Sequence, residues 1–323
     1  MLIDYALVIA GISLLVWSAD RFTDGAAAIA RNYGISPLVV GLTIVAMGSS
    51  APEVIVSINA AINNSPGLAV GNAIGSNIAN IAMVLGIAAL IIPLQVQSAT
   101  LKREIPILFL FIFLAFGLLI DLKLSFIDGL ILLFSLLGYL VWLTYQAAKQ
   151  KNQSDLMLKE IVDELPDNMP NKQAFFWVVV GLVLLQIGSY LLVLGATNIA
   201  QAYNVSNFII GITIVAVGTS LPELAATVSG VMKNEHELAI GNVIGSNIFN
   251  LLAVLSIPSL FNDVSIDLHI LTFDYSLMFA LTVAMSIMAW GRNGAPGKIT
   301  RLKGGLLLAC FLSYQIYQLV TNH

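Results

Sequence analysis

The sequence is short of charge, histidine and cysteine. Only 10% of its 323 residues are Asp, Glu, Lys or Arg, whereas soluble domains carry about 25%. The three histidines lie far apart in the sequence, and the one cysteine, Cys310, has no partner for a disulfide within the chain or a CxxC motif. These shortages exclude a disulfide scaffold and a zinc or iron site built from histidine and thiolate. They also leave too little polar surface for a water-soluble domain.

Apolar residues are gathered into long runs. Hydrophobic residues make up 58% of the chain, above the roughly 45–50% of soluble domains. Because a membrane-spanning helix needs about 20 apolar residues, the chain has room for about ten spans. We therefore predict an all-α integral membrane protein with ten transmembrane helices. The apolar runs place them at 4–29, 37–62, 68–92, 104–120, 125–147, 174–201, 207–231, 237–257, 273–290 and 303–320.

One hydrophilic stretch, 148–173, divides the chain into a first half, 1–147, and a second half, 174–323, each with five predicted spans. We interpret this stretch as a cytoplasmic linker. Lysine and arginine favour the cytoplasmic side of a membrane. If the N-terminus is outside, every lysine and arginine except Lys123 falls in an inner loop or at an inner span end. The charges thus predict that both termini lie outside.

The two halves repeat one sequence. Residues 41–53 read GLTIVAMGSSAPE and residues 211–223 read GITIVAVGTSLPE, with nine of thirteen positions identical at an offset of 170. Residues 71–80, GNAIGSNIAN, match 241–250, GNVIGSNIFN, at eight of ten positions with the same offset. Since each half has an odd number of spans, the second half enters the membrane from the opposite side. This pattern predicts an inverted repeat, which in secondary transporters places the substrate site between the halves.

A glutamate stands well inside an apolar span in each half. Glu53 lies in the second predicted span and Glu223 at the equivalent position of the seventh. A charged side chain at the centre of a membrane costs roughly 2.5–3.5 kcal/mol on insertion scales, so such residues mark ion paths and proton relays. The alternative is a glutamate that only holds the fold together. Symmetric placement of two glutamates favours the ion-binding interpretation.

A proline precedes each glutamate. Because proline has no N–H, Pro52 and Pro222 free backbone carbonyls near Gly48 and Gly218. Freed carbonyls at membrane depth are tolerated where protein, a polar cavity or a bound cation satisfies them. We therefore predict discontinuous helices in the second and third spans and in the seventh and eighth.

Hydroxyl and amide side chains surround these breaks. Ser50 shares a helix face with Glu53, and Ser220 shares one with Glu223. The third and eighth spans carry stripes with a polar residue every four positions: Asn72, Ser76 and Asn80, and Asn242, Ser246 and Asn250. Ligation by oxygen alone selects hard cations such as Na⁺, Ca²⁺ or Mg²⁺. Hydrogen bonding between helices is the alternative role for each serine and asparagine.

Other polar and small residues of these spans are predicted to be structural. The hydroxyls in this group are Thr43, Ser57, Thr213 and Thr227. Small residues four apart are expected to let the third and eighth spans approach a neighbouring backbone closely: Gly71 with Gly75, and Gly241 with Gly245. Asp20 and Asp24 are expected at the inner end of the first span, outside the central site.

The paired GxTxxAxGxSxPE and GNxIGSNxxN segments resemble the two alpha repeats of sodium/calcium exchangers, in the cation/Ca²⁺ exchanger superfamily. The span pattern extends the resemblance over nearly the whole chain. The short linker is similar to that of the prokaryotic branch, which implies the cell (inner) membrane of a prokaryote. The resemblance implies one Ca²⁺ site and up to three Na⁺ sites. Some relatives have aspartate where this chain has Asn250, so formal charge here rests on the two glutamates alone.

The resemblance also implies a ligand set. Its central members are Glu53 and Glu223, with hydroxyls from Ser50, Ser220, Ser76 and Ser246. Backbone carbonyls are implied for Ala46, Ser49, Ala216 and Thr219, and the remaining polar position of each half is occupied by Asn80 or Asn250.

The sequence therefore predicts a secondary antiporter that exchanges Na⁺ for Ca²⁺ by alternating access, with about three Na⁺ per Ca²⁺ by resemblance. The alternatives are an H⁺/Ca²⁺ antiporter and a cation channel. No Ser–His, His–Glu or Asp dyad motif accompanies the glutamates, so no enzymatic activity is expected. The expected partners are Na⁺, Ca²⁺ and the lipid bilayer, without a cofactor, nucleic acid or obligate protein partner.

Overall fold

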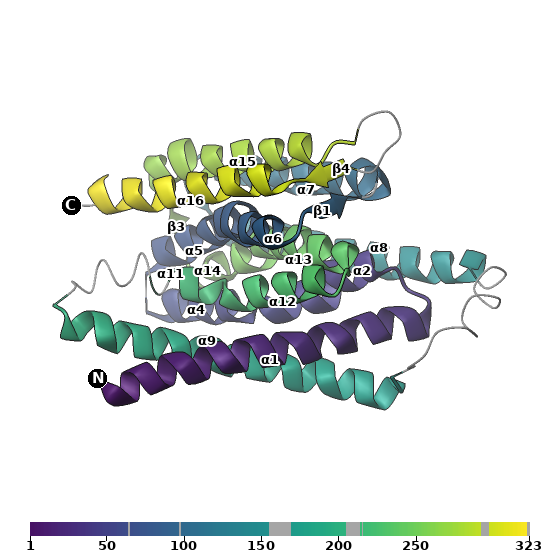
Figure 1. The fold of residues 1–323 in the computed structure, drawn as a ribbon. Helices are drawn as coiled ribbons and strands as arrows, with labels where there is room; N and C mark the ends of the chain where they lie inside the picture. Colours follow the sequence, from purple (N-terminus) through teal and green to yellow (C-terminus); the bar gives the residue numbers. More distant parts are fainter. Residues whose placement is uncertain are drawn as a thin grey trace.

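The computed structural model describes residues 1–63, 65–96, 98–154, 169–204, 214, 216–291 and 297–321. Long helices dominate this part of the chain, and four short strands form two ribbons (Figure 1). The first half contains α1 (Leu2–Tyr33), α2 (Pro37–Val40), the π-helix η1 (Gly41–Val45), α3 (Ala46–Ser49), α4 (Ala51–Ile62), α5 (Pro66–Ala79), the π-helix η2 (Asn80–Val84), α6 (Leu85–Ile91), β1 (Leu94–Val96), α7 (Ser98–Leu119), β2 (Lys123–Leu124) and α8 (Phe126–Ser154).

The second half has a similar order of elements. It contains α9 (Asn171–Ala202), α11 (Ala216–Thr219), α12 (Leu221–Met232), α13 (His236–Phe249), the π-helix η5 (Asn250–Val254), α14 (Ser256–Phe261), β3 (Val264–Ser265), the π-helix η6 (Ile270–Asp274), α15 (Tyr275–Met288), β4 (Gly297–Ile299) and α16 (Arg301–Thr321).

The described part of every predicted span is largely helical. Within the described residues, six helices are long and apolar enough to cross a membrane: Leu2–Tyr33, Gly67–Ile91, Phe126–Ala148, Asn171–Ala202, His236–Phe261 and Ile270–Met288. A seventh span results if the bent pair Pro37–Ser49 and Ala51–Ile62 crosses as one. The predicted spans 104–120 and 303–320 are helical as α7 and α16 but fall outside this set, and the predicted span 207–231 lies partly outside the described residues. The architecture is that of a multi-spanning helical membrane protein.

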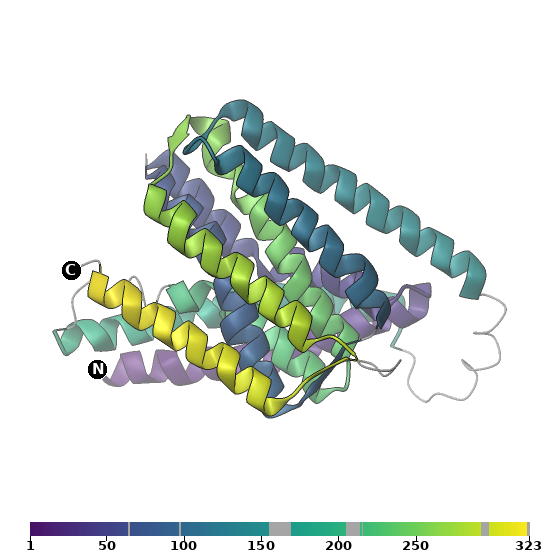
Figure 2. The same ribbon diagram turned by 90° about the horizontal axis from the view of Figure 1, so that it is seen from above.

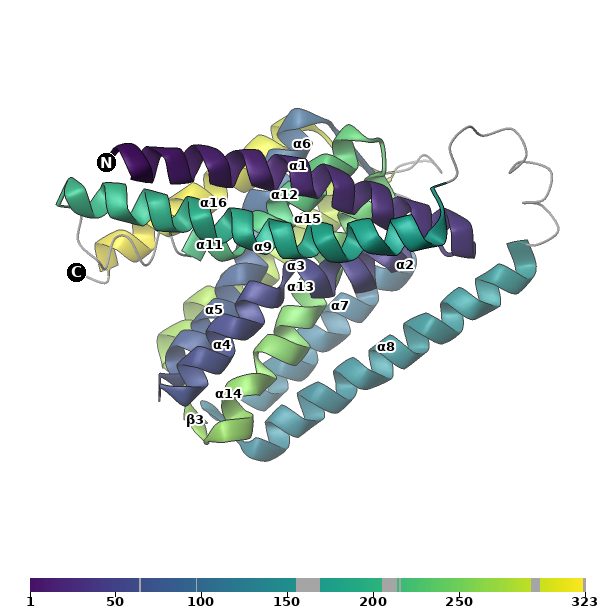
Figure 3. The ribbon, with the colours of Figure 1, turned by 90° about the horizontal axis from the view of Figure 1, so that it is seen from below.

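Helices α1 and α9 pack against each other along their length and lie across the other helices (Figure 3). They run antiparallel, because the Asp4 carboxylate near the start of α1 accepts a hydrogen bond from Asn198 near the end of α9. Glycines permit the close contact: a Cβ added to Gly11 would lie 2.6 Å from the Leu192 nitrogen, and one added to Gly181 would lie 2.7 Å from Phe22 Cβ. Residues 11 and 22 are offset by 170 from 181 and 192, so one contact occurs twice.

The second and seventh predicted spans break where the sequence predicts. Helix α3 ends at Ser49 and α4 begins at Ala51, with a bend of 44° between the two parts. The residue at the break, Ser50, has φ −80° and ψ 14°, and Ser220 between α11 and α12 has φ −89° and ψ 6°. Both lie in the bridge region of backbone conformations.

The third and eighth predicted spans do not break, so the prediction of discontinuity was wrong for these two. The helix Gly67–Ile91 is continuous, as is His236–Phe261. The physical reason is the sequence around the stripes: residues 67–91 and 237–257 contain no proline, so every residue there keeps its backbone N–H. Pro258 lies beyond the stripe, in α14 near the end of the second helix. Each span instead widens to a π-helix that begins at the last asparagine of its stripe, Asn80 or Asn250. Such π-helical turns are frequent at functional sites.

Two antiparallel ribbons connect the halves. β1 of the first half pairs with β4 of the second, and β2 of the first half pairs with β3 of the second. Helices α7, α15 and α16 lie on the side of the molecule opposite α1 and α9 (Figure 1), and α8 extends along the outer edge (Figure 2). The middle of the molecule therefore contains α4, α5 and α11–α14, which carry the repeated motifs.

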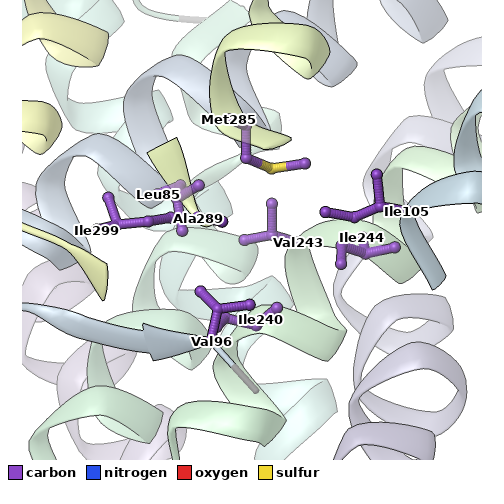
Figure 4. Close-up of a pocket in the computed structure, with 9 residues that line it drawn as sticks. All are labelled: Leu85, Val96, Ile105, Ile240, Val243, Ile244, Met285, Ala289 and Ile299. Atoms are coloured by element: carbon purple, nitrogen blue, oxygen red, sulfur yellow. The ribbon is translucent and has the colours of Figure 1, made fainter. Parts of the chain in front are cut away.

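A small cavity lies beside β1 and β4, between α6, α13 and α15 (Figure 4). Its walls are apolar side chains throughout, and the residues that line it are Leu85, Val96, Ile105, Ile240, Val243, Ile244, Met285, Ala289 and Ile299. Because a cation needs oxygen ligands, this cavity is not a candidate ion site.

Candidate cation-binding site

The two glutamates occupy equivalent positions at helix starts inside the protein. Glu53 is the third residue of α4 and Glu223 the third residue of α12. Their exposed fractions are 0% and 1%. The first turn of a helix presents unpaired backbone N–H groups and the positive end of the helix dipole, which favours a negative side chain there. The proline-induced breaks thus create two helix N-termini in the interior and place a carboxylate at each.

Each glutamate faces hydroxyls from the break of the other half. The Ser50 hydroxyl donates to Glu223 Oε1 at 2.8 Å. The Ser49 hydroxyl, which bonds Asn242 Oδ1 at 3.1 Å, also lies near Glu223, and the Thr219 hydroxyl lies near Glu53. The two carboxyl groups are also close enough to interact electrostatically. The halves therefore share one site, in which each break faces the opposite glutamate.

The asparagine and serine stripes of the third and eighth spans contact the same two residues. Asn72 Nδ2 donates to the Glu53 backbone carbonyl at 3.2 Å, and Asn242 Nδ2 donates to the Glu223 carbonyl at 3.3 Å. The Ser76 hydroxyl donates to Glu53 Oε1 at 3.4 Å. The repeated Gly-Asn motif thus holds the backbone of each glutamate from the neighbouring span, by the same bond in both halves.

Several buried polar atoms of this cluster have no hydrogen-bond partner among the described residues. They are Glu53 Oε2, Glu223 Oε2, Ser220 Oγ, Ser246 Oγ, and both side-chain polar atoms of Asn80 and Asn250. Buried polar groups are ordinarily paired. Carboxylate, hydroxyl and amide oxygens gathered in one dry region are the ligands that Ca²⁺ and Na⁺ prefer. The arrangement is able to bind one or more hard cations.

The backbone carbonyls implied by resemblance lie in the short helices before the two breaks. The Ala46 carbonyl accepts the Ser50 N–H at 3.1 Å and the Ser49 hydroxyl at 3.4 Å. The Ser220 N–H donates to the Val217 carbonyl at 3.1 Å. Sequence reasoning gave Ser49 and Thr219 only a carbonyl role, whereas their side chains also face the glutamates of the other half.

The hydroxyls that we predicted to be structural make structural bonds where they are described. Thr43 bonds the Val39 carbonyl of its own helix at 2.7 Å, and Ser57 bonds the Val254 carbonyl at 2.9 Å. Thr227 accepts a hydrogen bond from Asn242 at 2.9 Å. Thr213 lies outside the described residues.

The glycine pair of the eighth span packs closely against another backbone, as predicted. A Cβ added to Gly241 would lie 2.6 Å from the Leu38 carbonyl oxygen, and one added to Gly245 would lie 2.7 Å from Leu42 Cα. Around Gly71 and Gly75 no heavy atom of the described residues lies within 4 Å of such a Cβ. The segment equivalent to 38–46 is 208–216, most of which is not described.

Two polar side chains near the breaks were not predicted from the sequence. Gln186 Nε2 donates to the Gly48 carbonyl at 3.3 Å, and the Ser189 hydroxyl donates to the Gly218 carbonyl at 2.7 Å. Both belong to α9. The available signal was a pair of polar residues three positions apart in an otherwise apolar span. Asp20 and Asp24, by contrast, pair with Lys233, away from the glutamates as predicted.

Comparisons with known proteins agree with the fold and the motifs. The family model described as "Sodium/calcium exchanger protein" matches residues 3–145 and 173–320. CaxA of Alkalimonas amylolytica is 47% identical over 315 residues, 98% of each chain. The inner membrane protein YrbG of Escherichia coli is 40% identical over 299 residues, 92% of each chain.

A solved structure of the sodium-calcium exchanger NCX_Mj, soaked with Na⁺ and Ca²⁺, superposes on this chain with a TM-score of 0.82. It is 32% identical in sequence, and the match covers 97% of both chains. The family model and these relatives span nearly the whole chain, including both glutamate motifs. This chain is therefore a multi-pass membrane protein that belongs to the sodium/calcium exchanger family of transporters.

Proposed function

We propose that this protein exchanges Na⁺ for Ca²⁺ across the membrane by alternating access, with both ions bound at the cluster around Glu53 and Glu223. The observation that carries the proposal is the pair of buried glutamates, each facing the break of the opposite half and each keeping one carboxylate oxygen unpaired within the described structure. The similarity to NCX_Mj, titled a sodium-calcium exchanger, supports the same ions.

Two kinds of ion competing for one ligand set is the simplest physical basis of antiport. Two carboxylates neutralise one Ca²⁺, and the same carboxylates also balance Na⁺ ions. With about three Na⁺ per Ca²⁺, as the family resemblance implies, one net charge crosses per cycle. The membrane potential then contributes about 2.3 kcal/mol per charge per 100 mV. The ions are cargo, and the proposal needs no cofactor and no protein partner.

The proposed ligands are the residues that the sequence predicts. Glu53 and Glu223 are shared by the bound ions, and Ser50, Ser220, Ser76 and Ser246 supply hydroxyl oxygens. The amide oxygens of Asn80 and Asn250 and the carbonyls of Ala46, Ser49, Ala216 and Thr219 complete the set.

The proposed architecture has ten spans in two inverted halves, 1–147 and 174–323, joined by a cytoplasmic linker at 148–173. The antiparallel course of α1 and α9, which hold equivalent places in the two halves, supports inversion. The two termini lie toward the same end of the molecule (Figure 1), in keeping with an even number of spans. The distribution of lysine and arginine supports an arrangement with both termini outside the inner membrane of a prokaryote.

Ca²⁺ uptake into proteoliposomes tests the proposal. Vesicles loaded with Na⁺ and diluted into Na⁺-free buffer at fixed pH are expected to take up ⁴⁵Ca²⁺ faster than K⁺-loaded controls. If more than two Na⁺ leave per Ca²⁺, net positive charge moves outward during uptake. A valinomycin-set potential that is positive inside is then expected to accelerate uptake, and one that is negative inside is expected to slow it. Uptake equal to the K⁺ control would overturn Na⁺ coupling. Uptake driven by a pH gradient alone would assign H⁺/Ca²⁺ antiport, and flux without a counter-ion would assign a channel.

A further inference from the structure

The proline of each break leaves one particular carbonyl without its helical donor. In an α-helix the N–H of a residue donates to the carbonyl four positions earlier. Pro52 and Pro222 have no N–H, and the carbonyls four positions earlier belong to Gly48 and Gly218. Because an unpaired buried carbonyl is costly in a membrane protein, these two groups need donors from elsewhere.

One helix supplies both donors. Gln186 Nε2 donates to the Gly48 carbonyl and the Ser189 hydroxyl donates to the Gly218 carbonyl. The two residues are three positions apart on α9 and therefore share one face. The chain separations are 138 and 29 residues, so neither bond follows from local structure.

The same face of α9 also packs against both glycines. A Cβ added to Gly48 would lie 2.4 Å from Leu182 Cδ2, and one added to Gly218 would lie 2.2 Å from Val193 Cγ2. Leu182 precedes Gln186 by four residues and Val193 follows Ser189 by four. At each break, α9 therefore places an aliphatic side chain against the glycine and a hydrogen-bond donor on the glycine carbonyl. The two sets of contacts have the same composition.

Helix α1, which holds the equivalent place in the first half, carries no such donors. The residues offset by 170 from Gln186 and Ser189 are Val16 and Ala19, whose side chains have no N–H or O–H. The two donors are therefore particular to α9 and are not inherited from the repeat.

We propose that Gln186 and Ser189 are positioning residues for the cation site, which act through the Gly48 and Gly218 carbonyls; this inference rests on the proposed function. A peptide group is planar, so fixing the Gly48 carbonyl fixes the plane that leads to Ser49. The next residues at the two breaks, Ser49 and Thr219, face the glutamates of the other half, and the Ser49 hydroxyl bonds Asn242 Oδ1 at 3.1 Å. Through this path α9 holds the hydroxyls of both breaks toward one site.

Direct Ca²⁺ binding to the purified full-length protein, measured by isothermal titration without Na⁺, tests the inference. Gln186→Met removes one donor at similar side-chain size, and Ser189→Ala removes the other. Each variant is expected to raise the dissociation constant roughly tenfold, in the range found when groups that orient metal ligands are removed. In exchange assays the half-saturating Ca²⁺ concentration is expected to rise while the maximal rate changes little. Ser189→Thr keeps the hydroxyl and is expected to bind like the wild type.

Ser18→Ala is the matched control. Ser18 is also buried and lies on α1, and among the described residues its hydroxyl bonds the Leu14 and Leu15 carbonyls of its own helix. Its removal is expected to leave Ca²⁺ binding unchanged.

A lower unfolding temperature with a wild-type dissociation constant, in both Gln186→Met and Ser189→Ala, would show that α9 only stabilises the fold and would overturn the inference. The two variants act at separate breaks, so either one that folds provides the test. Wild-type protein that binds Ca²⁺ but shows no Na⁺-driven uptake would overturn the proposed exchange, and the binding comparison between variants would still decide the role of α9.

Discussion

The two halves carry nearly the same motifs, yet their serines make different bonds. In the first half, the Ser50 hydroxyl bonds Glu223 and the Ser76 hydroxyl bonds Glu53. In the second half, the equivalent hydroxyls of Ser220 and Ser246 are buried and have no partner in the part of the chain that the structure describes. Identical residue types in an identical local sequence therefore do not receive identical partners. The bonds across the halves depend on how the two breaks are placed relative to each other.

The backbone at the two breaks is, by contrast, alike. A single α-helical turn precedes each break, and Ser50 and Ser220 have similar backbone angles. In this structure the first break is tied to the opposite glutamate by Ser50, and the second leaves the Ser220 oxygen available to a ligand.

The largest expected effect comes from changing either of the two glutamates, Glu53 and Glu223, which both halves share. Glu53→Gln and Glu223→Gln each remove one of the two charges of the site. We expect each to lower ⁴⁵Ca²⁺ uptake by about 100-fold or more, because a charge-assisted contact contributes up to about 3 kcal/mol and about 1.4 kcal/mol is a factor of ten. Glu235→Gln is the control, since Glu235 pairs with the exposed Arg31. Wild-type exchange in either site variant would refute the shared-ligand role.

A smaller effect is expected on stability, and it differs between the equivalent serines of the two halves. Ser50→Ala removes a hydrogen bond to a carboxylate, so without cations we expect it to lower the free energy of unfolding by about 1.5–3 kcal/mol. Ser220→Ala removes no hydrogen bond that the structure contains, and we expect a change within about 0.5 kcal/mol. Thermal unfolding of both variants in detergent with chelator measures the difference. An equal loss of stability in both would mean that the halves are bonded alike in solution.

The smallest expected effect concerns the ion pairs between α1 and the end of α12. Lys233 Nζ lies 2.7 Å from Asp20 Oδ1 and 2.5 Å from Asp24 Oδ1, and thereby joins the end of α12 to α1. The equivalent positions in the other half, Asn63, Tyr190 and Leu194, hold no charge. Because these side chains are partly exposed, we expect Lys233→Ala to reduce stability by about 1 kcal/mol or less.

The difference between Lys233→Ala and the wild type is expected to shrink in 1 M salt, which screens exposed ion pairs. The exchanged pair Asp24→Lys with Lys233→Asp is expected to recover part of the loss. If the loss of stability in Lys233→Ala did not change with salt, the contribution of Lys233 would come from packing of its aliphatic stem and not from its charge.

Much of the fold was predictable because it follows from local rules. Apolar runs of sufficient length predicted helices, and a proline beside Glu53 or Glu223 predicted a break in the second and seventh spans. The same reasoning failed for the third and eighth spans, where glycine and asparagine stripes without proline gave continuous helices. A polar stripe alone does not break a helix, and in the second and seventh spans the break coincides with the loss of a backbone donor at proline.

The parts of the candidate site that sequence reasoning missed depend on distant packing. The side chains of Ser49 and Thr219 reach glutamates of the other half, and Gln186 reaches a carbonyl 138 residues away. The internal repeat gave no sign of Gln186 and Ser189, because their counterparts Val16 and Ala19 are apolar. Repetition identifies what the halves have in common and is silent about what only one of them provides.

Helix α9 supplies a hydrogen-bond donor to the glycine carbonyl at each break, so the two halves are not interchangeable. A gene that encoded the first half twice would place valine and alanine where Gln186 and Ser189 now stand, and its product would bury both glycine carbonyls without those donors. The first half therefore relies on a helix of the second half for the donor at its break. A symmetric design built from the first half therefore needs Val16→Gln and Ala19→Ser in the copy of α1 that replaces α9, in addition to the repeated motifs.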